Sequence, residues 1–333
     1  MSSFTRLTID DIARLAGVSR TTASLVLNGR AETYRISEAT SQRVLAVAAE
    51  HQFQPSQSAR ALRSRASHTL GLVVPQLTNF AHASLAEALE PLARAAGYQL
   101  MIVGSSDDPE QEAAGIGQLV ARQVDGLIVV PCNADPAAYA GWSKRLPLVF
   151  ADRRVAGSPI PFVVTAAAAA TETLVGDAIA RGAHEILYIG GGASLSTSAD
   201  RLAGYRAALD HAAIVPAADW ISERDYLRAS GQARLADWVA RHGRYPQAVF
   251  TGGITLLEGV LAFVNARGDE GPDFLLTFDD HPLLDCLPQP VQSVAQDSHA
   301  LASESLAAVL AQLAGQPAES ERWIDASLRH RRR

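Results

Sequence analysis

The segment that most constrains the fold is residues 8–28, TIDDIARLAGVSRTTASLVLN, which predicts two short helices joined by a tight turn. Thr8 is a candidate N-cap, and Asp11 stands three residues later, as in a capping box. Gly17 supplies the turn, because glycine adopts left-handed backbone angles readily. Ser19 is a suitable N-cap for the second helix. Local signals therefore fix both helix starts and the turn between them.

Apolar residues recur at helical spacing on both segments and predict one shared core. The second helix then directs Arg20, Thr21 and Ser24 outward. This layout is typical of a helix-turn-helix, whose second helix enters the DNA major groove with its first residues at the base edges. The alternative is an amphipathic helix pair within an unrelated bundle. The expected inner face comprises Ile12, Leu15, Ala16, Ala23, Val26 and Leu27.

The run DDIARLAGVSRTTASLVLNG resembles the headpiece of the LacI/GalR family of transcription regulators. RTTAS at 20–24 and YRIS at 34–37 most resemble the fructose repressor branch of that family. The resemblance implies a regulator that binds double-stranded DNA. Its DNA contacts are expected from Thr8, Ser19, Arg20, Thr21, Thr22, Ser24, Asn28 and Arg35.

A third helix is expected from Ser37 to about His51, which completes a headpiece over residues 1–54. Residues 55–68 are small, polar and arginine-rich, so they form either a flexible linker or a hinge helix. The family resemblance favours a hinge helix that folds on DNA. Ser58, Ala59 and Leu62 would share one face, with Leu62 wedged into the minor groove, because apolar wedges kink DNA at a base step.

Charge is distributed unevenly along the chain. The net formal charge is -6, yet residues 1–66 hold nine arginines against five acidic residues. A basic module on an acidic body suggests that only the headpiece contacts phosphates.

Composition excludes several classes of protein. No apolar run approaches the roughly 18–20 residues of a membrane helix, and the first residues, MSSFTRLTIDD, contain no apolar signal region. Cys132 and Cys286 have no metal-ligand spacing. GGG at 190–192 lacks the dinucleotide fingerprint, and no catalytic cluster is evident. We therefore expect no enzyme activity, no cofactor, no metal and no membrane partner, and a cytoplasmic, nucleoid-associated location.

From Leu70 onward, continuous apolar strands alternate with amphipathic helices, which predicts parallel sheets covered on both faces. The expected fold class is α/β, with a small all-α headpiece and two doubly wound lobes. The two halves resemble the periplasmic-binding-protein fold with three crossovers. Residues 69–333 would form an effector-binding and dimerisation domain. Lobe one is expected at about 69–161 and 291–321, and lobe two at about 162–290 and 322–333.

Ligands of such folds bind between the lobes, at the carboxyl ends of strands. Five polar residues are predicted there: Arg153, Arg201, Asp279, Asp280 and Gln296. Guanidinium groups match phosphate in bidentate fashion, and aspartates accept hydroxyl hydrogens. A sugar phosphate fits this set, and the fructose repressor resemblance points to fructose 1-phosphate.

Three departures from that branch bear on the identity of the sugar. Ala167 stands where the branch often has aspartate, Gly253 replaces a serine, and the loop at 76–84 lacks a Ser-Tyr pair. The prediction is a homodimeric repressor released from a palindromic operator by its effector, with a dimer surface that includes the helix at 82–96. The alternatives are a regulator with a different or vestigial cleft, one whose cleft serves a protein partner, and a solute-binding or sugar-processing protein.

Overall fold

The computed structural model describes residues 7–53 and 66–332, and it divides the chain into two units, residues 1–67 and 68–333. Within residues 7–53, the first unit has three helices around a small apolar core. Ile12, Ala13 and Ala16 face that core, whereas Leu15 is 47% exposed. The predicted inner face of the first helix was therefore wrong at Leu15, because Ala13 takes the inward position. The helices are α1 (Ile9–Leu15), α2 (Arg20–Leu27) and α3 (Glu38–Glu50).

The helix starts of this headpiece agree with the local sequence signals. The Thr8 amide donates to Asp11 Oδ2 at 2.9 Å, and the Asp11 amide donates to Thr8 Oγ1 at 3.3 Å. Ser19 Oγ accepts from the Thr22 amide at 3.1 Å. Gly17 has φ +63°, the left-handed conformation that the turn requires. The predicted capping box and turn are confirmed.

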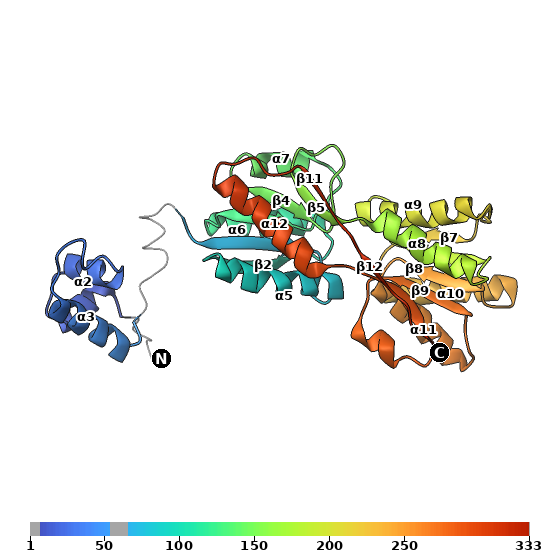
Figure 1. The fold of residues 1–333 in the computed structure, drawn as a ribbon, viewed down its shortest axis with the longest axis horizontal. Coiled ribbons are helices and arrows are strands. Elements are labelled where there is room, and N and C mark those ends of the chain that lie inside the picture. Colours follow the sequence, from blue (N-terminus) through green and yellow to red (C-terminus); the bar gives the residue numbers. More distant parts are fainter. Residues whose placement is uncertain (1–6, 54–65, 333) are drawn as a thin grey trace. The chain divides into compact units, whose positions relative to one another are not determined.

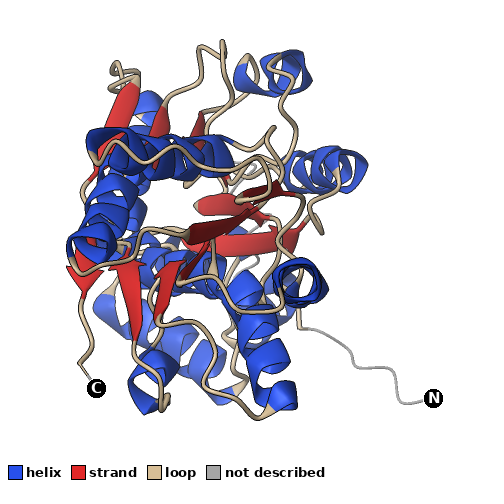
Figure 2. Cartoon of the chain, turned by 90° about the vertical axis from the view of Figure 1, so that its right-hand side faces the viewer, coloured by secondary structure: helices blue, strands red, loops and turns tan. Residues whose placement is uncertain are grey.

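The second unit contains two six-stranded sheets, each covered by helices on both faces (Figures 1 and 2). The first sheet has the order β11-β5-β4-β3-β1-β2, and the second β12-β10-β9-β8-β6-β7. All pairings are parallel except that of β12 with β10. The first sheet comprises β1 (Thr69–Val74), β2 (Gln99–Gly104), β3 (Gly126–Val129), β4 (Leu148–Ala151), β5 (Phe162–Thr165) and β11 (Glu321–Ile324). The second comprises β6 (Ile186–Gly190), β7 (Ile221–Glu223), β8 (Ala248–Thr251), β9 (Phe274–Phe278), β10 (Val291–Ala295) and β12 (Ser327–Arg329).

Three predicted strand assignments were wrong. The strand at 162–165 was expected to open lobe two, but β5 pairs with β4 and β11 in the first sheet. The strand at 291–295 was expected in lobe one, but β10 pairs with β9 in the second sheet. The single predicted last strand is two strands, one in each sheet. The repeated pattern along the chain marks where strands occur, whereas pairing across the sheet decides which lobe each one joins.

Helices cover both faces of these sheets. The chain crosses between the lobes three times, after β5, β10 and β11, which is the predicted number. On the first sheet, α5 and α12 contribute to one core and α6 and α7 to the other. On the second, α8 and α9 lie against one face and α10 and α11 against the other. The predicted return of the helix at 299–314 to lobe one is confirmed, since α12 packs on α5 and β4. The helices are α5 (Phe80–Ala95), α6 (Pro109–Ala121), α7 (Ala137–Ser143), α8 (Ala167–Ala180), α9 (Ser196–His211), α10 (Arg228–His242), α11 (Ile254–Arg267), α12 (Ser298–Leu313) and the 3-10 helix η1 (Pro282–Cys286).

No helix within residues 7–53 and 66–332 is both long enough and apolar enough to cross a membrane.

Candidate effector cleft and DNA-binding headpiece

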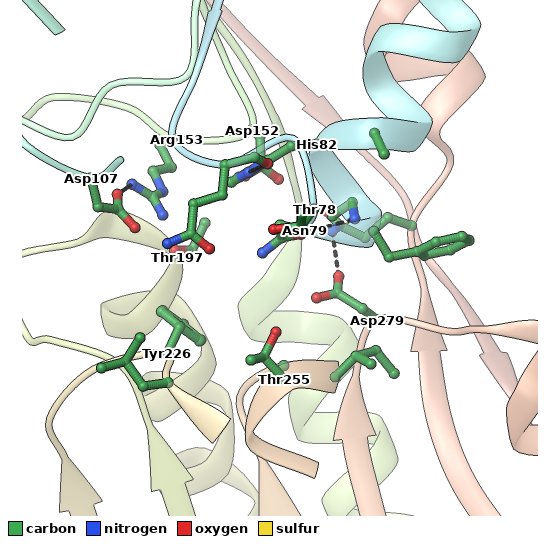
Figure 3. Close-up of a pocket in the computed structure, with 18 of the residues that line it drawn as sticks. Thr78, Asn79, His82, Asp107, Asp152, Arg153, Thr197, Tyr226, Thr255 and Asp279 are labelled. Atoms are coloured by element: carbon green, nitrogen blue, oxygen red, sulfur yellow. Dashed lines mark hydrogen bonds and ion pairs between the residues drawn. The ribbon is translucent and has the colours of Figure 1, made fainter. Parts of the chain in front are cut away.

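A cavity of about 410 Å³ lies between the two lobes, at the carboxyl ends of their strands. Figure 3 shows side chains from both lobes facing one another across it. Four of the five predicted effector residues line this cavity: Arg153, Arg201, Asp279 and Gln296. The sequence argument therefore found the correct edge of both sheets.

Two aspartates occupy equivalent places in the two lobes. Asp152 follows β4 and Asp279 follows β9, and these strands hold the same position in their sheets. Their φ angles are +63° and +70°, so both lie in the left-handed region. Asp279 accepts a hydrogen bond from Gln296 Nε2 at 2.6 Å (Figure 3), and Thr165 Oγ1 donates to Gln296 Oε1 at 2.6 Å. Burial raises the pKa of Asp279.

Arg153 is buried in lobe one and already holds an acidic partner. Its Nη1 donates to Asp107 Oδ1 at 2.7 Å and to the Pro131 carbonyl at 3.4 Å. Figure 3 shows the two side chains together on one side of the cleft. The Asp107 carboxylate therefore partly neutralises this guanidinium.

Arg201 is placed differently. It projects from α9, is only 5% exposed, and stacks on the Phe278 ring with 3.8 Å between its Cζ and the ring centroid. Its Nη1 donates to the Gly252 carbonyl and, at 3.2 Å, to the Tyr226 hydroxyl. Its Nε is buried without a hydrogen-bond partner, and no carboxylate of the described residues lies within ion-pair distance of it. Such a guanidinium is prepared to bind an anion.

His82 is a cleft residue that the sequence argument missed. Its Nδ1 lies 3.1 Å from the Gln76 carbonyl, and its Nε2 lies 3.9 Å from Asp152 Oδ2. Burial lowers the pKa of His82, which favours the neutral ring near pH 7. A carbonyl can only accept, so Nδ1 carries the proton, and Nε2 is left as an acceptor for a ligand hydroxyl.

Asp280 does not line the main cavity. Its carboxylate accepts from Ser293 Oγ at 2.6 Å and from Arg331 Nη2 at 2.9 Å. Burial opposes its charge, but these two donors outweigh burial and lower the pKa of Asp280. The prediction placed adjacent aspartates in one cleft, whereas the structure directs only Asp279 there and uses Asp280 to hold the last segment of the chain.

Further lining residues come from loops and helix starts that have no distinctive sequence pattern. Asp152 could have been found, because it ends the same strand that led to Arg153. Gly253 lines the cleft, whereas Ala167 is buried at the start of α8 and does not line it. The lining residues not predicted include Thr78, Asn79, His82, Asp107, Asp152, Thr197, Asp225, Tyr226, Thr255 and Glu258.

In the headpiece, most of the predicted DNA-binding side chains are accessible. Thr8, Ser19, Arg20, Thr21 and Arg35 are exposed. Three others are half-buried: Thr22, Ser24 and Asn28. The predicted hinge residues Ser58, Ala59 and Leu62 lie outside the described residues.

The fold and cleft define a class of protein: a helix-turn-helix module joined to a two-lobed binding domain. Residues 8–56 match the model for bacterial regulatory proteins of the lacI family. Residues 67–313 match the model for periplasmic binding proteins and the sugar binding domain of the LacI family. The chain belongs to the LacI family, and it is a DNA-binding transcription regulator with a sugar effector rather than an enzyme.

Individual relatives are similar along most of their length. The chain is 42% identical to the sucrose operon repressor of Klebsiella pneumoniae over 328 residues, 98% of both chains. It is 38% identical to the catabolite repressor/activator of Salmonella typhimurium over 310 residues, 92% of both. It also superimposes on the Cra transcriptional dual regulator of Pseudomonas putida, solved in complex with fructose 1-phosphate. That match has a TM-score of 0.72 at 29% identity and covers 80% of this chain and 99% of the other.

Proposed function

We propose that this protein is a homodimeric repressor that binds a palindromic operator at the nucleoid through α2, and that a sugar phosphate such as fructose 1-phosphate releases it. The observation that carries the proposal is Arg201, a buried guanidinium that lines the cleft and has no carboxylate of the described residues within ion-pair distance. Leaving a buried charge unpaired is costly, and a ligand phosphate would pair with it.

The surroundings of Arg201 support an anion at this end of the cleft. Two helices, α9 and α11, begin beside it without a side-chain N-cap, at Leu195 and Gly253. Thr197 and Thr255 in their first turns line the cavity. Helix N-termini carry partial positive charge and free N–H groups, which favour phosphate. Arg153 is a weaker candidate for binding the phosphate, because its guanidinium is already paired with the Asp107 carboxylate.

The sugar would be held by the acidic and polar side chains of the opposite lobe. Asp152, Asp107 and the His82 Nε2 can accept hydroxyl hydrogens there. Two of the similar proteins bear on the choice of sugar, since one is named for the sucrose operon and the Cra structure contains fructose 1-phosphate.

A neutral sugar is the second candidate, and one observation favours it. The cleft is lined by five carboxylates against two guanidinium groups. Carboxylates repel a phosphate but accept hydroxyl hydrogens from a neutral sugar. The phosphate proposal therefore requires that the attraction between Arg201 and the phosphate exceed the repulsion from the carboxylates that line the cleft.

Calorimetry separates these candidates. Fructose 1-phosphate, fructose and sucrose are titrated against wild type, Arg201→Ala, Arg153→Ala and the control Arg244→Ala. Arg244 is an exposed arginine that pairs with Glu185 and does not line the cleft. We expect the sugar phosphate to bind most tightly, and Arg201→Ala to lose roughly a hundredfold in affinity, as for a charged hydrogen bond of about 3 kcal/mol.

The result also decides between the broader alternatives. Tighter binding of fructose or sucrose would refute the phosphate assignment. No binding of any sugar would indicate a vestigial cleft or one that serves a protein partner. A gel shift on genomic fragments, with and without the ligand, tests release from the operator. Absence of any DNA binding would favour a solute-binding protein.

A further inference from the structure

A tyrosine ring in the cleft lies on a floor of glycines. Tyr226 stands in the loop between β7 and α10 and lines the cavity (Figure 3). A Cβ on Gly191 would lie 2.0 Å from Tyr226 Cε2, and a Cβ on Gly253 would lie 3.4 Å from Cδ1 and Cε1 of the same ring. A larger residue at 191 would displace the ring. The ring therefore explains the glycine at 191, whereas a Cβ at 253 would only be in van der Waals contact with the ring.

The hydroxyl of this ring reaches Arg201. It lies 3.2 Å from Arg201 Nη1 and 3.1 Å from Ser198 Oγ. An arginine only donates, so the hydroxyl oxygen accepts from Nη1 and its own hydrogen is free to bond to Ser198. Gly252 and Phe278 hold the same guanidinium from other sides. One terminal nitrogen is therefore fixed, and this sets the orientation of the whole planar guanidinium that lines the cleft.

We infer that Tyr226 is a positioning residue that sets the charge preference of the cleft: its hydroxyl orients Arg201, and the glycine floor holds its ring in place. The inference rests on the proposed sugar phosphate. A guanidinium on a long side chain has many rotamers, and holding one of them in advance reduces the entropy lost when an anion binds. A neutral sugar gains much less from this arrangement, because it has no phosphate for Arg201 to bind.

The test is a double-mutant cycle read by calorimetry with two ligands. Tyr226→Phe removes the hydroxyl and keeps the ring, and Arg201→Lys keeps a charge but has no planar guanidinium to orient. Fructose 1-phosphate and fructose are titrated against wild type, both single variants and the double variant. We expect Tyr226→Phe to weaken fructose 1-phosphate about tenfold, as for a lost hydrogen bond to a charged group. The affinity for fructose should fall less than threefold. In the Arg201→Lys background, Tyr226→Phe should cause little further loss of affinity for fructose 1-phosphate.

Two further variants complete the design. Tyr245→Phe is the matched control, because its hydroxyl bonds to exposed Asp269 away from the cleft, and we expect wild-type affinities. Gly191→Ala should displace the ring and weaken both ligands, with thermal unfolding curves checking that each variant is folded.

If Tyr226→Phe weakens fructose 1-phosphate and fructose equally, the positioning role is overturned, even if fructose 1-phosphate binds as proposed. Additive losses of affinity in the double-mutant cycle would overturn it as well. If fructose binds more tightly than its phosphate, the proposed function fails. In that case the cycle with fructose decides the inference separately: coupled losses retain a positioning role, and independent losses remove it.

Discussion

At the scale of single residues, the headpiece separates side chains that can read DNA from those that hold the module together. Arg20 is the first residue of α2, its side chain is 70% exposed, and its contact with Asp10 is a loose one of 3.5 Å. Thr22 and Asn28, by contrast, bond within the helix, to Ser19 Oγ and to the Ser24 carbonyl. Arg20 is therefore freer than Thr22 or Asn28 to leave its present partner and bind a base.

Arg20→Ala should weaken binding to the true operator by about 1–3 kcal/mol and relax base preference at one position in each half-site. Binding to a panel of operators with single substitutions measures both effects. Arg14→Ala is a control at the end of α1, where arginine pairs with Asp11. A uniform loss on every sequence would make Arg20 a phosphate contact only.

At the scale of elements, the start of α1 depends on a charge. Hydrogen bonds from the Thr8 backbone and side chain, together with Arg14, lower the pKa of Asp11 from 3.8 to about 2. A carboxylate whose pKa is lower in the folded state stabilises that state, and the stabilisation is fully present at pH values above the pKa of the unfolded state. This contribution is lost as the pH falls from 3.8 towards 2.

Asp11→Asn should therefore remove a pH-dependent part of α1 stability between about pH 4 and pH 2. Amide hydrogen exchange at residues 8–15 of the full chain follows it directly. Asp10→Asn is the matched control, because Asp10 is in the same first turn but is not the capping-box partner of Thr8. The same pH profile in wild type and Asp11→Asn would contradict this role for the capping box.

A second element-scale feature connects the lobes beside the ligand residues. Arg154 follows Arg153, and Asp200 precedes Arg201 on α9. Their side chains form a bidentate pair, Nη1–Oδ2 at 2.5 Å and Nη2–Oδ1 at 2.8 Å. Arg154 also lies over the Trp323 ring of the first sheet at 4.9 Å. The pair therefore joins lobe one to the helix that carries Arg201.

Asp200→Asn should weaken this contact between the lobes by about 1 kcal/mol, the upper range for such a pair. Small-angle scattering of the ligand-free protein should show a larger mean separation of the lobes, and effector affinity should fall about fivefold. Glu185→Gln breaks a bidentate pair with Arg244 inside one lobe and serves as the control. Equal effects of the two variants would show that the pair of Arg154 and Asp200 does not connect the lobe contact to effector binding.

At the scale of the whole molecule, the proposal requires two copies. One helix-turn-helix reads too few base pairs to be selective, and a two-fold dimer matches a palindromic site. The predicted dimer surface includes α5 in lobe one. Light scattering at micromolar protein should give twice the chain mass of 35.3 kDa. A stable monomer under those conditions would contradict the assembly.

The sequence predicted what local spacing controls and failed where distant residues decide. Caps and the Gly17 turn depend on neighbours within four residues, so these elements could be placed. The lobe of β5 or β10 depends on pairing across a sheet. Asp279 and Asp280 are adjacent and identical in type. Only their distant partners distinguish them: Gln296 bonds to Asp279, whereas Ser293 and Arg331 bond to Asp280. Tyr226 lies in a loop, and no pattern connects it to Arg201.

The left-handed backbone at Asp152 and Asp279 has a consequence for genetics. A non-glycine residue held there costs on the order of 1–3 kcal/mol, and glycine adopts the same angles without strain. Replacing Asp279 by glycine also removes a half-buried carboxylate whose pKa is raised by burial. A selection for heat-resistant protein should thus favour Asp279→Gly, and the selected alleles should encode repressors whose response to the effector is altered, because this residue lines the cleft.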